Sequence, residues 1–282
     1  MTTMSRHRIA RTVGAIARYA AVLVFVLVAL FPFAWMVLTA LKPASEVRAF
    51  PIGWLPENPT LDNFVTVFES RDLGVLLTNS LMVATATALI TTSISVLAAY
   101  GLSRLLRAAA TPITLAILMA QMLPTVLLVV PYFIMLRTAG LLDTLVALIV
   151  TNVSFTLPIC TWLLRRFVQK VPKELDEAAM VDGCTRLGAL LRVIVPAARP
   201  GIAAAFIYTF LVSWHEYLFA LSLTTSRENR VVTVGIASLI GQYGVSWGEL
   251  MAMGIIAVVP LVVVFLVVEK HLVEGLAGGV KG

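Results

Sequence analysis

Two clusters of polar residues interrupt a chain that is otherwise almost entirely apolar. The first contains Glu177, Ala178, Ala179, Asp182 and Gly183, and Pro196 follows it after a basic, leucine-rich stretch. The second consists of Trp214, His215, Glu216 and Tyr217. Carboxylates and imidazoles accept hydrogen bonds from hydroxyl groups, and an indole ring can stack on a ring-shaped ligand. Because no soluble catalytic domain accompanies them, these residues predict binding surfaces and no catalytic residue.

The composition predicts an all-α membrane protein with six transmembrane helices. Of the 282 residues, 60% are hydrophobic and 13% are charged, whereas soluble domains average about 25% charged residues. Runs of 18 or more apolar residues are transmembrane candidates, because a helix satisfies its own backbone groups within the hydrocarbon. Six runs fit, roughly 18–41, 76–103, 113–136, 144–166, 201–224 and 249–268. They leave an N-terminal tail of residues 1–17, a six-span domain of residues 18–268 and a Gly-rich tail of residues 269–282.

The distribution of Lys and Arg orients these spans. With a cytoplasmic N-terminus, 15 of the 21 basic residues lie on the cytoplasmic side, so the positive-inside rule places both termini in the cytoplasm. The same bias accounts for the net charge of +6, and no nucleic-acid partner is expected. The first span follows four arginines, as a signal peptide would. Its apolar run is too long for one and no small-x-small cleavage site follows, so we expect it to be retained.

The first polar cluster is predicted to form a cytoplasmic helical hairpin, about residues 171–196, between spans 4 and 5. Pro172 and Glu174 suit a helix start, and Gly183 suits a helix end, because glycine adopts a left-handed conformation without steric cost. A second helix, with apolar Leu187 and Ile194 on one face, is expected to end before Pro196. The alternative is an amphipathic loop lying on the lipid surface.

The outward loop of residues 42–75 is predicted to contain an amphipathic helix, with Leu61, Phe64, Val65 and Phe68 on one face. Small and hydroxyl residues in span 2 favour close helix contacts, and prolines in spans 3, 4 and 6 can kink those helices.

The two cysteines and three histidines are scattered, so we expect no metal site. No Gly-Lys-Ser/Thr phosphate loop is present, so the chain is not expected to bind ATP in that way itself.

The spacing of the hairpin residues resembles the cytoplasmic coupling signature of ABC importer permeases. That signature, the EAA motif, is Glu-Ala-Ala, three residues, Gly, nine residues and an aliphatic-x-aliphatic-Pro ending, here Val193 to Pro196. The chain is similar over nearly its whole length to carbohydrate-type permeases, specifically the smaller maltose-transporter permease. Further matches are Asn79-Ser80-Leu81, residues 98–104, Trp214 with Glu216, and the end GLAGGVKG. His215 stands where such permeases usually carry Asn, and the loop after Arg104 lacks their aromatic-Gly-basic pattern.

The resemblance implies a subunit of an importer in a bacterial or archaeal cytoplasmic membrane. Its expected partners are a second homologous permease, two cytoplasmic ATPase subunits and an external solute-binding protein, besides membrane lipid. This chain is expected to bind no cofactor, since ATP and Mg would bind the ATPases. Glu177, Ala178, Ala179, Asp182, Gly183 and Pro196 would couple it to the ATPases. Gly278, Gly279 and Lys281 of the tail would reach between those ATPases.

The sequence allows more than one role for the second polar cluster, more than one class of solute and more than one class of membrane protein. Trp214, His215, Glu216 and Tyr217 could contact a sugar or form a polar link to the companion permease, and the resemblance favours the link. The solute is expected to be a sugar or oligosaccharide, with glycerol-phosphate-type solutes as the alternative. An ion-gradient carrier and a scaffold for a membrane complex are the other classes, and neither explains the hairpin.

Overall fold

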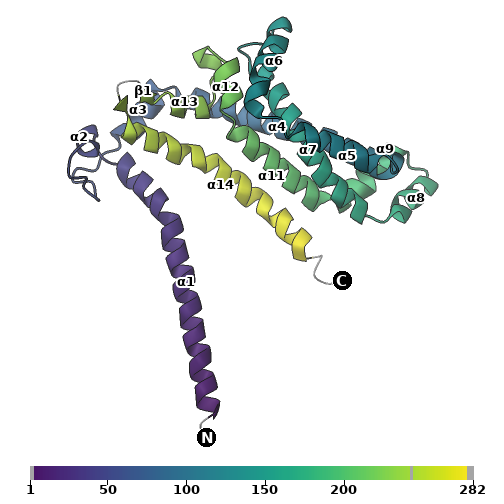
Figure 1. Cartoon of the computed structure of the whole chain (residues 1–282), viewed down its shortest axis with the longest axis horizontal. Helices are drawn as coiled ribbons and strands as arrows, with labels where there is room; N and C mark the ends of the chain where they lie inside the picture. Colours follow the sequence, from purple (N-terminus) through teal and green to yellow (C-terminus); the bar gives the residue numbers. More distant parts are fainter. Residues whose placement is uncertain (1–2, 242–243, 278–282) are drawn as a thin grey trace. The chain divides into compact units, whose positions relative to one another are not determined.

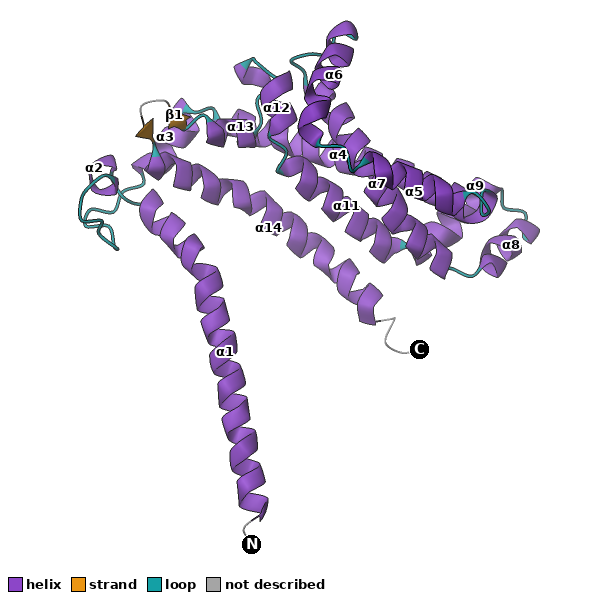
Figure 2. Cartoon of the chain, viewed as in Figure 1, coloured by secondary structure: helices purple, strands orange, loops and turns teal. Residues whose placement is uncertain are grey.

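The structure is a computed structural model that describes residues 3–241 and 244–277. Helices dominate it, as Figures 1 and 2 show. The chain divides into two units. Unit 1 comprises Met1–Arg71 and Leu239–Ile256, and unit 2 comprises Asp72–Ser238 and Ala257–Gly282.

Four helices in the described part of the chain are long and apolar enough to cross a membrane. They are α1 (Thr3–Ala40), α4 (Leu73–Tyr100) with the π-helical turn Gly101–Leu105, α7 (Leu145–Lys170) and α14 (Trp247–Ala277). Two bent helix pairs raise the possible number of spans to six. They are α5 (Ala110–Ala120) with α6 (Thr125–Thr138), and Arg186–Ala197 with α11 (Arg199–Trp214).

The third predicted span, 113–136, is wrong as a continuous helix. α5 ends at Ala120, α6 begins at Thr125, and the two are bent by 90°. Pro124 accounts for the break, because its ring disfavours helical backbone at the preceding residue and it has no N–H to continue the hydrogen-bond ladder. The result is an elbow near the middle of the apolar segment.

The fifth predicted span, 201–224, is also wrong as a single helix. α11 ends at Trp214, and α12 (Leu218–Leu223) follows as a separate helix. The two carboxylate oxygens of Glu216 accept hydrogen bonds from the backbone N–H groups of Phe219 (2.7 Å) and Ala220 (2.9 Å). A carboxylate just before a helix can accept hydrogen bonds from the N–H groups of its first turn, which have no partner within the helix. Glu216 therefore stabilises the start of α12.

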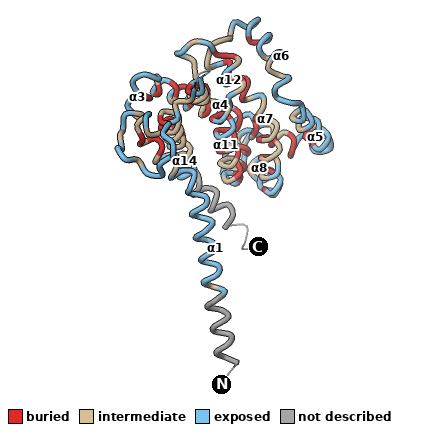
Figure 3. Tube along the Cα trace, turned by 60° about the vertical axis from the view of Figure 1, so that its left-hand side comes forward, coloured by how far each residue is buried: buried red, intermediate tan, exposed pale blue. Residues whose placement is uncertain are grey.

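The core of unit 2 forms where α4 packs along α7 and α11, and much of this contact is buried in Figure 3. The predicted close packing of span 2 is confirmed, because most of its small and hydroxyl residues, among them Thr87, Ala88 and Thr91, are buried there. Hydroxyl groups meet across the helices, with Thr91 Oγ1 3.0 Å from Thr156 Oγ1 and Ser213 Oγ 3.5 Å from Thr87 Oγ1. Such residues let helix backbones approach closely within a membrane.

Asp143 joins two loops at one end of unit 2. Its carboxylate accepts hydrogen bonds from the N–H groups of Thr225 (2.9 Å) and Ser226 (3.0 Å), and its own N–H donates to Leu223 O (2.9 Å). The loop continues through the 3-10 turn Arg227–Asn229 to α13 (Val232–Ala237). The connection between α6 and α7 is thereby fixed to the segment that follows α12.

In unit 1, the apolar side chains of α1 are exposed over most of its described length, for example Phe25 at 73% and Leu27 at 59%. A long apolar helix with such exposure is typical of a membrane span. α2 (Ala44–Val47) and α3 (Asp62–Ser70) follow it. The predicted amphipathic helix is therefore present, but Val67 is its buried residue, while Leu61, Val65 and Phe68 remain exposed.

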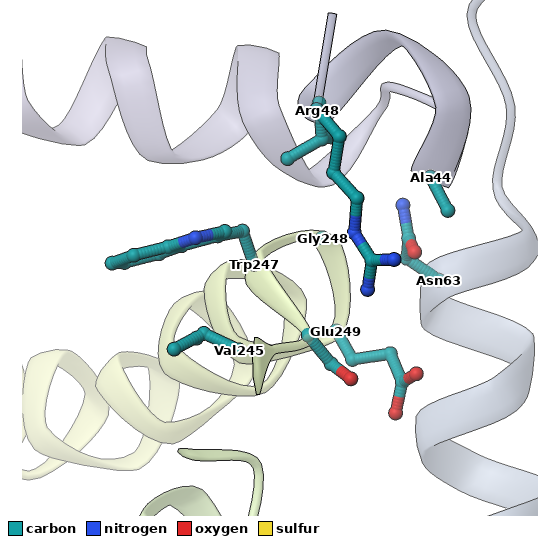
Figure 4. Close-up of a pocket in the computed structure, with 9 residues that line it drawn as sticks. Ala44, Arg48, Asn63, Val245, Trp247, Gly248 and Glu249 are labelled. Carbon is teal, nitrogen blue, oxygen red and sulfur yellow. The ribbon is translucent and has the colours of Figure 1, made fainter. Parts of the chain in front are cut away.

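Asn63 fixes α3 to the end of α1. Its Nδ2 donates to the carbonyl oxygens of Ala40 and Lys42, both at 2.8 Å. Figure 4 shows Asn63, Arg48 and Glu249 around a pocket of about 110 Å³. A short hairpin of β1 (Ile240–Gly241) and antiparallel β2 (Gly244–Val245) precedes α14 in this unit.

Candidate functional site

α8 (Lys173–Val181) is the first helix of the predicted hairpin, and its ends follow from its sequence. Pro172 flanks its start, with Glu174 and Asp176 in the first turn, where acids stabilise the positive end of the helix dipole. Gly183 has φ +89°, so the predicted left-handed helix end is confirmed. The Cys184 N–H donates to Ala179 O (2.9 Å) and the Gly183 N–H to Met180 O (3.1 Å), which is a Schellman motif.

The second helix of the hairpin does not end before Pro196, so that expectation is wrong. α9 (Arg186–Ala189) leads through the π-helical turn Leu190–Ile194 into α10 (Val195–Ala197), which contains Pro196. A proline ring normally collides with the carbonyl four residues earlier. The wider π turn just before Pro196 moves that carbonyl and accommodates the ring.

The surface of α8 and α9 exposes apolar side chains next to acids. Val181 is 87% exposed and Leu187 is 56% exposed, while Glu177 and Asp182 are exposed beside them. Ala178 is exposed and Ala179 is half-buried. We call this surface the hairpin face, and define it by Glu177, Ala178, Val181, Asp182 and Leu187. An exposed apolar patch bordered by polar residues marks a protein or membrane contact.

A buried ion pair fixes α8 to the end of α4. Arg104 Nε lies 2.6 Å from Asp176 Oδ2, and the two side chains are 10% and 4% exposed. The guanidinium also donates to Val171 O (2.8 Å), directly after α7. Arg104 thus links the ends of two apolar helices to the hairpin. This ion pair was not predicted, because an acid among several acids and an arginine 72 positions away give no local signal in the sequence.

A pocket of about 170 Å³ adjoins this ion pair, lined by Tyr100, Arg104, Leu105, Lys173, Asp176, Glu177, Met180 and Arg186. Within the described part of the chain, Asp176 Oδ1 is buried and accepts no hydrogen bond. Asp176 thus has one carboxylate oxygen with a partner and one without, in a pocket that Glu177 of the hairpin face also lines.

The second polar cluster is not gathered into one site. Trp214 is 3% exposed and stacks on Phe210, with ring centroids 5.7 Å apart. His215 is exposed, with Nδ1 2.9 Å from Leu211 O, and Tyr217 is 40% exposed. Glu216 uses both carboxylate oxygens to stabilise α12.

Gly278, Gly279 and Lys281 lie outside the described residues, because α14 is described only as far as Ala277. Among the side chains that the structure describes, those of residues 14–241 and 244–267, no three His, Cys, Asp or Glu residues gather as metal ligands do.

Residues 91–277 match the model of the family described as the binding-protein-dependent transport system inner membrane component. The chain belongs to this family. It is 38% identical to the sulfoquinovosyl glycerol transport system permease protein SmoH of Agrobacterium fabrum, over 94% of this chain and 93% of that protein. It is 35% identical to the trehalose/maltose transport system permease protein MalG of Thermococcus litoralis, over 91% and 93% of the two chains.

The fold agrees with this membership. A bacterial ABC transporter involved in the import of the acidic polysaccharide alginate has a similar chain, with a TM-score of 0.78 and 19% identity, over 93% of this chain and 97% of that chain. This family member is therefore a multi-pass, mostly helical permease subunit of a binding-protein-dependent importer. It is a transport subunit and not an enzyme.

Proposed function

We propose that this permease crosses a bacterial or archaeal cytoplasmic membrane six times, with both termini in the cytoplasm. The six crossings would be α1, α4, the α5–α6 pair, α7, the segment ending in α11, and α14. The excess of basic residues on the side of the hairpin supports this orientation. A second homologous permease would complete the pathway.

The hairpin face is the contact for a cytoplasmic ATPase, and the exposure of Val181 and Leu187 beside Glu177 and Asp182 carries this proposal. Two such ATPases would bind ATP and Mg, since this chain has no phosphate loop. Closing of the ATPase pair would move α8, and Arg104 would transmit the motion to α4 and α7. Gly278, Gly279 and Lys281 would add a second contact with the ATPases.

The solute is a sugar or a sugar-containing molecule, delivered by an external solute-binding protein. The names of two relatives support this class, since SmoH is a permease protein of a sulfoquinovosyl glycerol transport system and MalG one of a trehalose/maltose transport system. The bonds that Glu216 already makes within this chain favour a structural role over a sugar contact. Glycerol-phosphate-type solutes are the alternative that the experiment must exclude.

Reconstitution in proteoliposomes tests the proposal. The complete complex with its binding protein should take up maltose, trehalose or another glycoside only when ATP is present on the ATPase side. This chain alone should take up none with an imposed proton or sodium gradient. Uptake by the chain alone would identify an ion-gradient carrier, and uptake of glycerol 3-phosphate without any glycoside would refute the sugar assignment.

A further inference from the structure

A second pocket of unit 2 lies at the elbow between α5 and α6. Its volume is about 210 Å³, and it is lined by Ala120, Gln121, Leu123, Thr125, Leu128, Tyr132, Ser154, Phe155 and Pro158. The elbow falls in the middle of the segment Ala110–Thr138, and Ser154 lies near the middle of α7. The pocket is therefore at membrane depth, where polar groups are rare unless they have partners or a function.

Two prolines leave backbone acceptors at this pocket. Pro124 has no N–H to donate to Ala120 O, and Pro158 has none to donate to Ser154 O, so neither carbonyl has its usual helical partner. Ala120 and Ser154 both line the pocket. Irregular backbone at membrane depth is tolerated where it lines a cavity, and interrupted helices mark binding sites in other transporters.

Side chains add hydroxyl and amide groups. Tyr132 Oη lies 2.6 Å from Ser154 Oγ, and Gln121 Nε2 donates to Phe155 O (2.9 Å). In the part of the chain that the structure describes, Gln121 Oε1 and Thr125 Oγ1 make no hydrogen bond. These groups can accept from ligand hydroxyls, and the Thr125 hydroxyl can also donate.

An aromatic wall completes the pocket. The ring centroid of Phe155 lies 5.5 Å from that of Tyr132 and 5.0 Å from that of Phe219. Rings in such a cluster hold one another in place and present a flat apolar surface to a ligand. Several hydroxyl-binding groups beside an aromatic surface match a sugar ring, which has hydroxyls at its edge and C–H groups on its faces.

We propose that the elbow pocket, built from Gln121, Tyr132, Ser154 and Phe155, is a subsite for one sugar ring of the transported solute. The proposal rests on the proposed sugar-import function and assigns this chain a direct solute contact. The volume of about 210 Å³ is below the roughly 300 Å³ at which small-molecule sites begin. The subsite therefore holds one ring, and the remainder of a larger solute lies outside it.

Thiol protection tests the subsite directly. Ser154→Cys is introduced with Cys184→Ser, since Cys160 is buried, and the complete complex is treated with a water-soluble thiol reagent during ATP turnover. The sugar that the complex imports, taken from a panel of maltose, trehalose and diacetylchitobiose, should slow labelling at least threefold. Thr225→Cys, in an exposed loop, is the matched control and should react at the same rate with or without sugar. Absence of labelling, or labelling unaffected by the imported sugar, would overturn the subsite.

Uptake measurements distinguish the subsite from the general function. Tyr132→Phe and Gln121→Leu should each lower sugar uptake per ATP hydrolysed by about two- to tenfold, the range expected from losing one hydrogen bond. Tyr208→Phe removes a hydroxyl from α11 outside the pocket and should leave uptake unchanged. Sugar uptake unaffected by both pocket variants refutes the subsite alone. A complex that imports glycerol 3-phosphate but no sugar refutes the sugar function and the subsite together.

Discussion

Arg104 and Asp176 form a buried ion pair with side chains that are 10% and 4% exposed. The charge of each side chain is therefore compensated by the other. Removing one partner of a buried ion pair leaves an uncompensated charge, which destabilises by about 3–5 kcal/mol. We predict that Arg104→Ala and Asp176→Ala each lower the free energy of unfolding in mixed detergent micelles by roughly that amount. The double change Arg104→Met with Asp176→Leu should cost much less than the sum, because it leaves no buried charge. Additive losses would show that the pair is not coupled.

The left-handed backbone conformation of Gly183 ends helix α8. Its φ of +89° costs a β-branched residue about 1–2 kcal/mol, although no atom lies within 4 Å of a Cβ built there. Gly183→Val should therefore reduce sugar-stimulated ATP hydrolysis and uptake together. Gly183→Asn should retain most of both, because Asn tolerates the left-handed region. Equal activity of the two variants would show that the turn does not matter for coupling.

The helix end at Gly183 could be predicted because a helix end is local, and a single glycine specifies it. The Arg104–Asp176 pair could not be predicted, because only the folded chain brings together two residues 72 positions apart. The elbow pocket was missed for a related reason. Pro124 and Pro158 are each ordinary in a membrane helix, and the acceptors they free become a site only where α5, α6 and α7 meet.

At the level of elements, Asp143 connects the α6–α7 loop to the segment after α12. Asp143→Ala should lower the free energy of unfolding by about 1–3 kcal/mol, since it removes the hydrogen bonds to its carboxylate and places Ala at φ +57°. Asp143→Asn should cost less, because its amide oxygen still accepts and Asn tolerates that backbone. Thermal unfolding of both variants against the parent measures the difference, and equal loss in both would contradict this account.

The charge of Asp143 also gives a pH dependence. Backbone N–H donation from Thr225, followed by Ser226, holds the pKa of this carboxyl below its ordinary value. Its stabilisation is therefore complete above the ordinary carboxyl pKa, about 3.9, and is lost as the pH falls through the lower folded pKa. Acid titration of the melting temperature should show this loss in the parent and not in Asp143→Asn.

The break between α11 and α12 could not be predicted from the apolar pattern of the sequence. Hydropathy predicted one helix over residues 201–224, because Trp214 to Tyr217 interrupt the run only briefly. Whether a short polar stretch continues a helix or starts a new one depends on the bonds that its side chains form. Here the Glu216 carboxylate binds N–H groups of the following turn and starts α12.

For the whole molecule, the orientation in the membrane is the broadest prediction. Arg107→Cys, in the turn after the π-helical end of α4, should be protected in intact cells from a membrane-impermeant thiol reagent. Thr225→Cys, in a loop predicted to face outward, should react. Both are introduced into a Cys184→Ser chain, because Cys184 is partly exposed. The reverse pattern would invert the topology and place the hairpin face outside the cell.

We propose that the hairpin face couples this permease to an ATPase, and the variant Val181→Asp tests that coupling. At 87% exposure, Val181 contributes little to the fold of this chain, so the variant should insert and assemble with the companion permease. In proteoliposomes with binding protein and sugar, we expect ATP hydrolysis and uptake to fall together by at least tenfold, while Arg107→Gln, an exposed change off this face, leaves both intact. Normal sugar-stimulated hydrolysis and uptake by the Val181→Asp complex would show that the hairpin face is not the ATPase contact.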